Sequence, residues 1–217
     1  MKKLILVLTL SLVFGLGTMS LAQATVVSFI PAFSGIDTST GAWSTTDDAV
    51  NLGITSFNIL GGAGTVTAFN GTFSQRGTRG IGVWGGLDTD EIDKGTNGQE
   101  SIEINFPTLP YVLNSFELRS LFNESTGIEY ADVYYYLNSI QVGHDVLVGT
   151  DLTGTNGVKS GYPNILLDKI VFKVDTGSIE SEFAIASLDV TPVPEPTSMM
   201  LLGMGILGLF GFKKRKN

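Results

Sequence analysis

Acidic side chains gather in one short segment, residues 85–95, which reads Gly-Gly-Leu-Asp-Thr-Asp-Glu-Ile-Asp-Lys-Gly. Four carboxylates fall within six residues of this segment, and like charges this close repel one another unless a cation lies between them. Calcium takes carboxylate and carbonyl oxygens as ligands, so the segment predicts a calcium site formed by Asp88, Asp90 and Asp93 with a backbone carbonyl. The spacing differs from that of an EF-hand loop, so the prediction rests on charge density alone.

The same acids have two other interpretations. In the first, Glu91 and Asp93 cap a turn or form ion pairs, while Ile92 anchors the loop in the core. The basic residues within reach are Arg76, Arg79 and Lys94. In the second, two of the acids form the pair of a glycoside hydrolase, which needs one protonated and one ionised carboxyl group about 5 to 9 Å apart. Because acid-rich loops produce such pairs by chance, we expect the protein not to be an enzyme.

The aromatic residues Trp84, Tyr134 and Tyr136 form a second candidate site, for carbohydrate. Tyr134 and Tyr136 are two positions apart, so a strand places both rings on one face, where an exposed ring can stack on a sugar. Ordinary packing in the core or across strands is the alternative interpretation. The single histidine, His144, is interpreted as a loop residue, because no Gly-x-Ser-x-Gly elbow accompanies it to indicate a Ser-His-Asp triad.

Short β-strands must position these side chains, because the central part of the sequence shows almost no helical periodicity. In residues 101–106, Ile102, Ile104 and Phe106 share one face and polar residues share the other. Residues 169–174 alternate in the same way, with both lysines on the polar face. The predicted strands are 26–33, 64–69, 81–84, 101–106, 115–119, 130–137, 140–142, 169–174 and 183–190. About nine to eleven such strands without crossover helices predict an all-β fold, an antiparallel two-sheet β-sandwich with jelly-roll-like connections.

Charge and cysteine content narrow the possible partners and chemistry. Residues 25–196 hold all 21 Asp and Glu residues but only seven of the 13 Lys and Arg residues, which leaves a net charge of −14. No basic surface is available to neutralise phosphates, so nucleic acid and anionic lipid are excluded as partners. The sequence contains no cysteine, which excludes disulfides, thiolate-bound zinc and iron-sulfur clusters. The length of this part fits one domain.

The N-terminal end has the three parts of a secretory signal peptide. Lys2 and Lys3 provide a positive start, and residues 4–16 form an apolar run too short to be a typical membrane span. Ala22-Gln23-Ala24 then matches the small side chains that signal peptidase accepts. We therefore expect a helical signal peptide at residues 1–24, cleaved after Ala24.

The C-terminal end also has three parts in order. Pro194, Glu195 and Pro196 form a motif that the two prolines keep out of a helix. An uncharged apolar run, residues 199–212, predicts a short transmembrane helix. Four basic residues, 213–216, follow and favour a cytoplasmic location for that end. An ordinary single-pass anchor that is never processed is the alternative interpretation.

This arrangement of Pro194-Glu195-Pro196, short apolar helix and basic end resembles the PEP-CTERM sorting signal of Gram-negative bacteria. The resemblance covers only the tail, residues 193–217, and leaves a predicted β-sandwich domain at residues 25–192. It implies recognition by an exosortase, a membrane-embedded enzyme, which removes the helix and releases or attaches the mature protein outside the inner membrane. Such proteins commonly occur in bacteria that make exopolysaccharide and biofilm.

Three functions remain open from the sequence. The first is an exported surface or extracellular-matrix protein with a structural or adhesive role in biofilm or exopolysaccharide. The second is a carbohydrate-binding module that depends on calcium or on aromatic side chains. The third and most remote is a glycoside hydrolase. All three place the protein in the cell envelope, at the surface or outside the cell, with signal peptidase and exosortase as processing partners and exopolysaccharide as a candidate ligand.

Overall fold

The structure is a computed structural model of the chain. It describes residues 22–30, 33–39, 43, 46, 48–85, 91–93, 98–124, 127–151, 158–174 and 181–193. Residues Ala24–Pro192 form one compact unit. The predicted C-terminal membrane helix lies outside the described residues, as does the predicted signal peptide except for its last three residues. Within the described part of the chain, no helix is long and apolar enough to cross a membrane.

A six-stranded antiparallel sheet forms one layer of the compact unit, with the strand order β13-β12-β17-β8-β4-β3. Its members are β3 (Ser56–Ile59), β4 (Gly64–Phe69), β8 (Ser101–Asn105), β12 (Tyr130–Leu137), β13 (Ile140–Val148) and β17 (Lys169–Lys173). A 3-10 turn, Leu60–Gly62, joins β3 to β4. Alternation of apolar and polar residues predicted five of these strands at least in part, and it decides which face each side chain takes; β3 was not predicted.

A nine-stranded sheet forms the other layer, with a main order β15-β9-β18-β6-β5-β2. These strands are β2 (Val50–Asn51), β5 (Thr72–Arg76), β6 (Gly80–Trp84), β9 (Tyr111–Arg119), β15 (Lys159–Gly161) and β18 (Glu182–Pro192). The remaining three members are β1 (Thr25–Ser28) and β7 (Ile92–Asp93), which pair with β18, and β16 (Ile165–Leu167), which pairs with β9. A small third sheet contains β10 (Phe122–Glu124), β11 (Gly127–Ile128) and β14 (Thr150–Asp151), and its β10–β14 pair is parallel.

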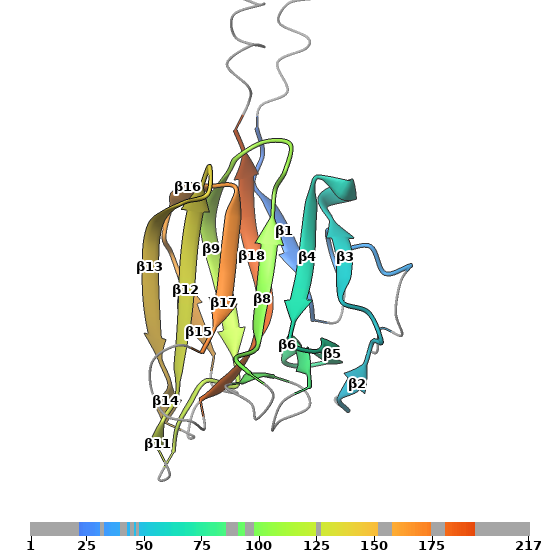
Figure 1. The fold of residues 1–217 in the computed structure, drawn as a ribbon, viewed down its shortest axis with the longest axis vertical. Coiled ribbons are helices and arrows are strands. Elements are labelled where there is room, and N and C mark those ends of the chain that lie inside the picture. The colour runs from blue at the N-terminus through green and yellow to red at the C-terminus, as the bar shows by residue number, and fades with distance from the viewer. Residues whose placement is uncertain are drawn as a thin grey trace, which may run out of the picture. The chain divides into compact units, whose positions relative to one another are not determined.

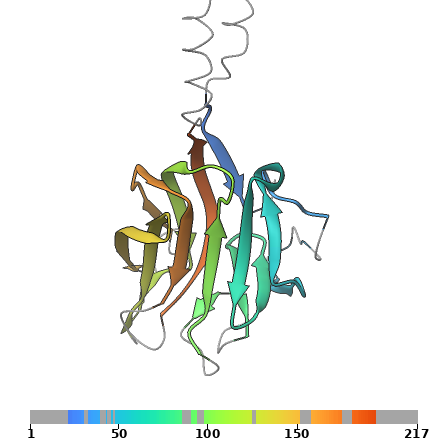
Figure 2. The same ribbon diagram turned by 45° about the horizontal axis from the view of Figure 1, so that its top comes forward.

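Apolar side chains from the facing sides of the two large sheets form the core, and the sheets are seen as two layers in Figures 1 and 2. The ring centroid of Phe116 on β9 lies 5.6 Å from that of Phe172 on β17, and the rings meet edge to face. Phe57 on β3 meets Phe73 on β5 in the same way, with centroids 4.9 Å apart. All four side chains are buried. Each pair therefore joins one sheet to the other across a dry interior.

The prediction of an all-β, antiparallel sandwich is confirmed by this architecture. The bounds predicted for 64–69 and 130–137 are those of β4 and β12. The strand predicted at 26–33 ends at Ser28, and the one predicted at 115–119 begins four residues earlier, at Tyr111. The jelly-roll pattern of connections stays a prediction.

Two predictions about the segment after β12 are wrong. The strand predicted at 140–142 continues to Val148, and His144 lies in this strand, β13, rather than in a loop. The register of β12 with β13 shifts between Tyr135 and Tyr136, and Gly143 lies opposite Tyr135. A Cβ atom at Gly143 would lie 2.9 Å from Cδ2 of that ring, so the close approach requires glycine. This bulge breaks the alternation that sequence reasoning relied on.

Tyr135 is the one aromatic residue of β12 that points into the core. Its side chain is 1% exposed, and its hydroxyl donates a 2.8 Å hydrogen bond to Oδ2 of Asp145 on β13. Burial, together with this hydrogen bond and the charge of Asp145, raises the pKa of the Tyr135 phenol well above its ordinary value. The folded state therefore favours the neutral phenol.

Phe172→Ala should lower the free energy of unfolding by about 3 to 5 kcal/mol, because it removes a buried ring that contacts the opposite sheet. Phe69→Ala is the matched control, since Phe69 is 42% exposed. Urea unfolding followed by tryptophan fluorescence measures both. An equal loss for the two variants would contradict a core shared by the two sheets.

Tyr135→Phe should cost about 1 kcal/mol near neutral pH through the lost hydrogen bond. The raised pKa means that the neutral phenol stabilises the fold fully below about pH 10, and that this contribution is lost as the pH rises further. The variant should therefore lose less stability than the wild type between pH 8 and pH 11, roughly the span that brackets phenol ionisation. Tyr162→Phe, at a position 76% exposed, should follow the wild type, and urea unfolding at the two pH values distinguishes the cases.

Candidate functional site

The predicted calcium ligands are described only in part. Asp88 and Asp90 lie outside the described residues, while Asp93 ends β7 and is 4% exposed. Its N–H donates to Oε2 of Glu100 at 3.1 Å, and the N–H of Glu100 donates to the Asp93 carbonyl at 3.2 Å. No group of three or more His, Asp or Glu side chains placed to hold a metal occurs among the residues that the structure describes. The calcium site therefore stays a prediction.

The alternative interpretation of the acidic segment is confirmed at two positions. Glu91, whose side chain is fully buried, forms an ion pair with Nη1 of Arg79. Ile92 is fully buried in the core cluster. A buried carboxylate needs such a partner, because desolvation without one is costly. Part of the segment is therefore explained by anchoring the loop to the sandwich.

The three predicted carbohydrate-binding aromatics do not share one surface. Trp84 ends β6 in the nine-stranded sheet, whereas Tyr134 and Tyr136 lie on β12 in the six-stranded sheet. Because Tyr135 points inward, Tyr134 and Tyr136 both point to the outer face of their sheet, as the two-residue period predicts. All three are half-buried.

Tyr134 packs between residues of the two neighbouring strands. His144 on β13 stacks on it with ring centroids 4.1 Å apart and planes 9° from parallel. Nζ of Lys173 on β17 lies 4.6 Å from the Tyr134 centroid. Since β13 and β17 flank β12, the phenol lies between an imidazole and an ammonium group. This is the cross-strand packing that was the alternative to sugar stacking.

A buried carboxylate holds the histidine of this cluster. Oδ1 of Asp132 lies 2.8 Å from Nε2 of His144, and the Asp132 side chain is fully buried although it belongs to the outer face. His144 lies directly opposite Tyr134 in the β12–β13 register, and Asp132 lies two residues before Tyr134 on the same face of β12. The register alone therefore brings the three side chains together. Within the described chain no serine hydroxyl hydrogen-bonds to His144, so this pair lacks the nucleophile of a catalytic triad.

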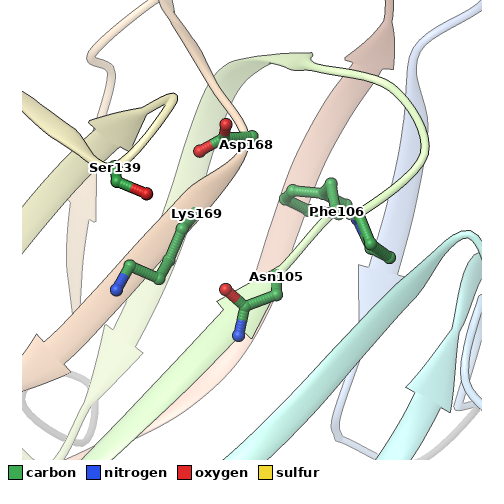
Figure 3. Close-up of a pocket in the computed structure, with 6 residues that line it drawn as sticks. Asn105, Phe106, Ser139, Asp168 and Lys169 are labelled. Atoms are coloured by element: carbon green, nitrogen blue, oxygen red, sulfur yellow. The ribbon is translucent and has the colours of Figure 1, made fainter.

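Tyr136 lies beside a more open feature. Nζ of Lys169 is 4.6 Å from its ring centroid, and the same ammonium group forms a 2.9 Å ion pair with Oε2 of Glu103. Lys169 also lines a surface pocket of about 400 Å³, shown in Figure 3, which lies where β8 ends and β17 begins. The other residues that line the pocket are Asn105, Phe106, Pro107, Ser139 and Asp168.

Backbone hydrogen bonds fix the frame of this pocket. The N–H of Phe106 donates to the Asp168 carbonyl at 2.7 Å, and the N–H of Asp168 donates to the Tyr136 carbonyl at 2.9 Å. The Asp168 carboxylate accepts a 2.7 Å bond from the N–H of Asn138 in the turn between β12 and β13. Three segments distant in sequence therefore meet around one hollow. Its carboxylate, amide, hydroxyl and ammonium groups are of the kinds that hydrogen-bond to hydroxyl-rich ligands.

Sequence reasoning missed the pocket, although one signal for it existed. Asn138 and Ser139 adopt positive φ angles of 52° and 65°, as the two central residues of a tight hairpin turn do. The predicted strands 130–137 and 140–142 leave this Asn-Ser pair between them, and such a pair indicates a turn with Ser139 at the tip of the hairpin. Asn105 and Asp168 come from other strand ends, and nothing in the sequence shows that these ends meet.

Two solved carbohydrate-binding modules are similar to this chain only at a low level. A fucose-binding module of Streptococcus pneumoniae matches with 13% identity and a TM-score of 0.29, covering 81% of this chain and 92% of its own. The family 32 carbohydrate-binding module of NanJ from C. perfringens, solved with galactose, matches with 15% identity and a TM-score of 0.30, covering 79% and 93%. At such low scores and identities, neither the fold nor the ligands of these modules are transferred to this chain.

Sequence comparison identifies only the C-terminal tail. No curated protein matches the chain. A family model described as the PEP-CTERM protein-sorting motif matches residues 192–216. The match begins at Pro192, the last residue of β18, and includes Pro194, Glu195 and Pro196, which lie outside the described residues. The motif implies export, a membrane-anchored precursor and processing by an exosortase, and the chain is a protein that carries a PEP-CTERM sorting motif at its C-terminus.

Proposed function

We propose that this chain is an exported envelope or matrix protein whose β-sandwich has a structural or adhesive role in biofilm or exopolysaccharide. Residues 1–24 are removed as the signal peptide, residues 25–192 are the functional domain, and an exosortase cuts or transfers the chain at Pro194-Glu195-Pro196. We expect no catalytic activity from the domain. The observation that carries the proposal is the sorting motif at residues 192–216.

The junction between the domain and the motif supports this division. β18 pairs with β9 along almost its whole length, up to Pro192, so the ordered ladder runs to the first residue of the motif. Two prolines just beyond prevent a helix from forming through the cleavage motif. An enzyme at the membrane surface would then meet an extended segment directly attached to a folded domain.

Replacing Pro194, Glu195 and Pro196 together with alanine should leave the tail attached, because the motif that the exosortase is proposed to recognise is lost. Intact-mass spectrometry of the protein from its native host measures this directly. The wild type should begin at Thr25 and lack the basic end, whereas the variant should keep the tail, residues 193–217. Ser198→Ala is the control and should be processed like the wild type. An unprocessed wild-type tail ending in Asn217 would contradict exosortase processing.

A second candidate function is carbohydrate binding at the pocket beside Tyr136. Polar groups from three segments line the pocket, and the ring of Tyr136 lies next to it. Lys169 connects the two, because it lines the pocket and its ammonium group lies over the Tyr136 ring. Tyr134 is less suited to stacking on a sugar, because His144 and Lys173 lie against it. The binding residues of this candidate are therefore Tyr136, Asn105 and Asp168 rather than the original trio of aromatics.

Tyr136→Ala should weaken any glycan binding by about two- to ten-fold, because loss of one stacked ring costs on the order of 0.5 to 1.5 kcal/mol. Isothermal titration with exopolysaccharide from the native host, in calcium and in chelator, measures both modes of this function. Tyr162→Ala, at an exposed site, is the matched control and should bind like the wild type. Absence of binding by the wild type in both conditions would eliminate this candidate.

A further inference from the structure

β13 is the one long edge strand in the described part of the chain. It lies at the end of the six-stranded sheet and spans nine residues, and β12 is its only strand partner there. The strand at the other edge of this sheet, β3, has four residues, and the edge strands β15 and β2 of the nine-stranded sheet have three and two. Long unpaired edges offer a row of free N–H and C=O groups to another chain.

β13 carries four of the nine exposed large apolar side chains among the described residues. Ile140, Val142, Val146 and Val148 are 68%, 42%, 46% and 43% exposed. The strand contains no Lys, Arg, Glu or Pro, the residues that usually protect an edge. Its one carboxylate, Asp145, is bonded inward to Tyr135. Among the described residues, the bulge near Gly143 is the one protecting feature of this edge, and it lies in the first half of the strand.

The hydrogen-bond pattern between β12 and β13 shows which backbone N–H and C=O groups of β13 face away from β12. The N–H of Gly149 donates to the Glu129 carbonyl at 2.9 Å, in register with the ladder. Because hydrogen-bonded pairs alternate along antiparallel strands, the odd-numbered residues of β13 from Gly143 onward bond to β12. The N–H and C=O groups of His144, Val146 and Val148 therefore point away from the sheet. These three residues are consecutive free positions beyond the bulge.

This row is self-complementary. An antiparallel copy placed about a two-fold axis at Val146 puts Val146 opposite its own counterpart and His144 opposite Val148. Each of these pairs joins residues whose free groups face the partner, so all three positions can form a regular ladder. The arrangement is closed, because each copy offers the same patch to the other. We propose that two copies of this chain pair antiparallel along β13, about a two-fold axis at Val146, to form one continuous sheet.

The charge of the protein determines how this dimer responds to salt. Residues 25–196, the part that remains after the proposed processing, carry a net charge of −14, so two copies repel one another at long range. The paired edges carry no exposed acid, so added salt screens the repulsion without weakening the ladder itself. A short ladder of three pairs is small beside a standard interface of about 1,600 Å², so we expect a weak dimer that tightens with salt.

Sedimentation velocity on the protein purified from its native host tests the pairing between about 10 µM and about 1 mM. The wild type should shift from monomer to dimer, and the dissociation constant should fall several-fold between about 0.05 M and about 0.5 M NaCl. Val146→Lys should weaken the dimer at least ten-fold. Val26→Lys makes the same charge change at a 53% exposed valine on β1, so it should dimerise at least as well as the wild type.

Val146→Pro tests the edge itself, because the N–H that it removes points away from β12 and no hydrogen bond within the sheet is lost. The variant should keep the wild-type circular dichroism and urea midpoint and remain monomeric. Hydrogen exchange should show the amides of Val146 and Val148 exchanging freely in the monomer and protected in the dimer. A wild type that stays monomeric in all conditions, a folded Val146→Pro variant that dimerises normally, or edge amides already protected in the monomer would each overturn the proposal.

Discussion

Burial of apolar side chains between two sheets is the constraint on which the rest of this structure depends. The chain is predicted to be exported, yet it has no cysteine, so no disulfide supports the fold outside the cell. Stability must come from packing such as that of Phe116 against Phe172 and of Phe57 against Phe73. Each strand of the two layers therefore has to present its apolar face inward in a fixed register, because a slip of one residue would expose it.

That register also creates the polar features of the surface. When Val133 and Tyr135 point inward, Asp132, Tyr134 and Tyr136 must point outward, where neighbouring strands place His144, Lys173 and Lys169 against them. The resulting clusters need no dedicated loop and follow from which strands are adjacent. The pocket beside Tyr136 has the same origin, since it forms where three strand ends meet. The register that buries the apolar side chains therefore also fixes the positions of the side chains on the candidate ligand-binding surface.

Apolar-polar alternation in the sequence predicted the position of several strands and the face on which their side chains lie. The strands at 64–69 and 130–137 and the outward lysines at Lys169 and Lys173 all follow from local periodicity. Local periodicity does not show which strands distant in sequence lie side by side. The contact of Lys173 with Tyr134 and the proximity of Asn105 to Asp168 were therefore not predictable. The length of β13 was underestimated because Gly143 and His144 interrupt the apolar pattern, and only the close approach to Tyr135 explains the glycine.

The best-defined functional feature is the sorting motif at residues 192–216, which implies export of the protein. The described residues of the β-sandwich indicate its function less clearly.

The central claim is that one core holds both sheets together as a single cooperative unit. Native-state hydrogen exchange on the full chain tests it most directly, by comparing the slowest amides of β8 and β17 with those of β9 and β18. The account predicts one common opening free energy for all four strands. Exchange of one sheet while the other stays protected would contradict it.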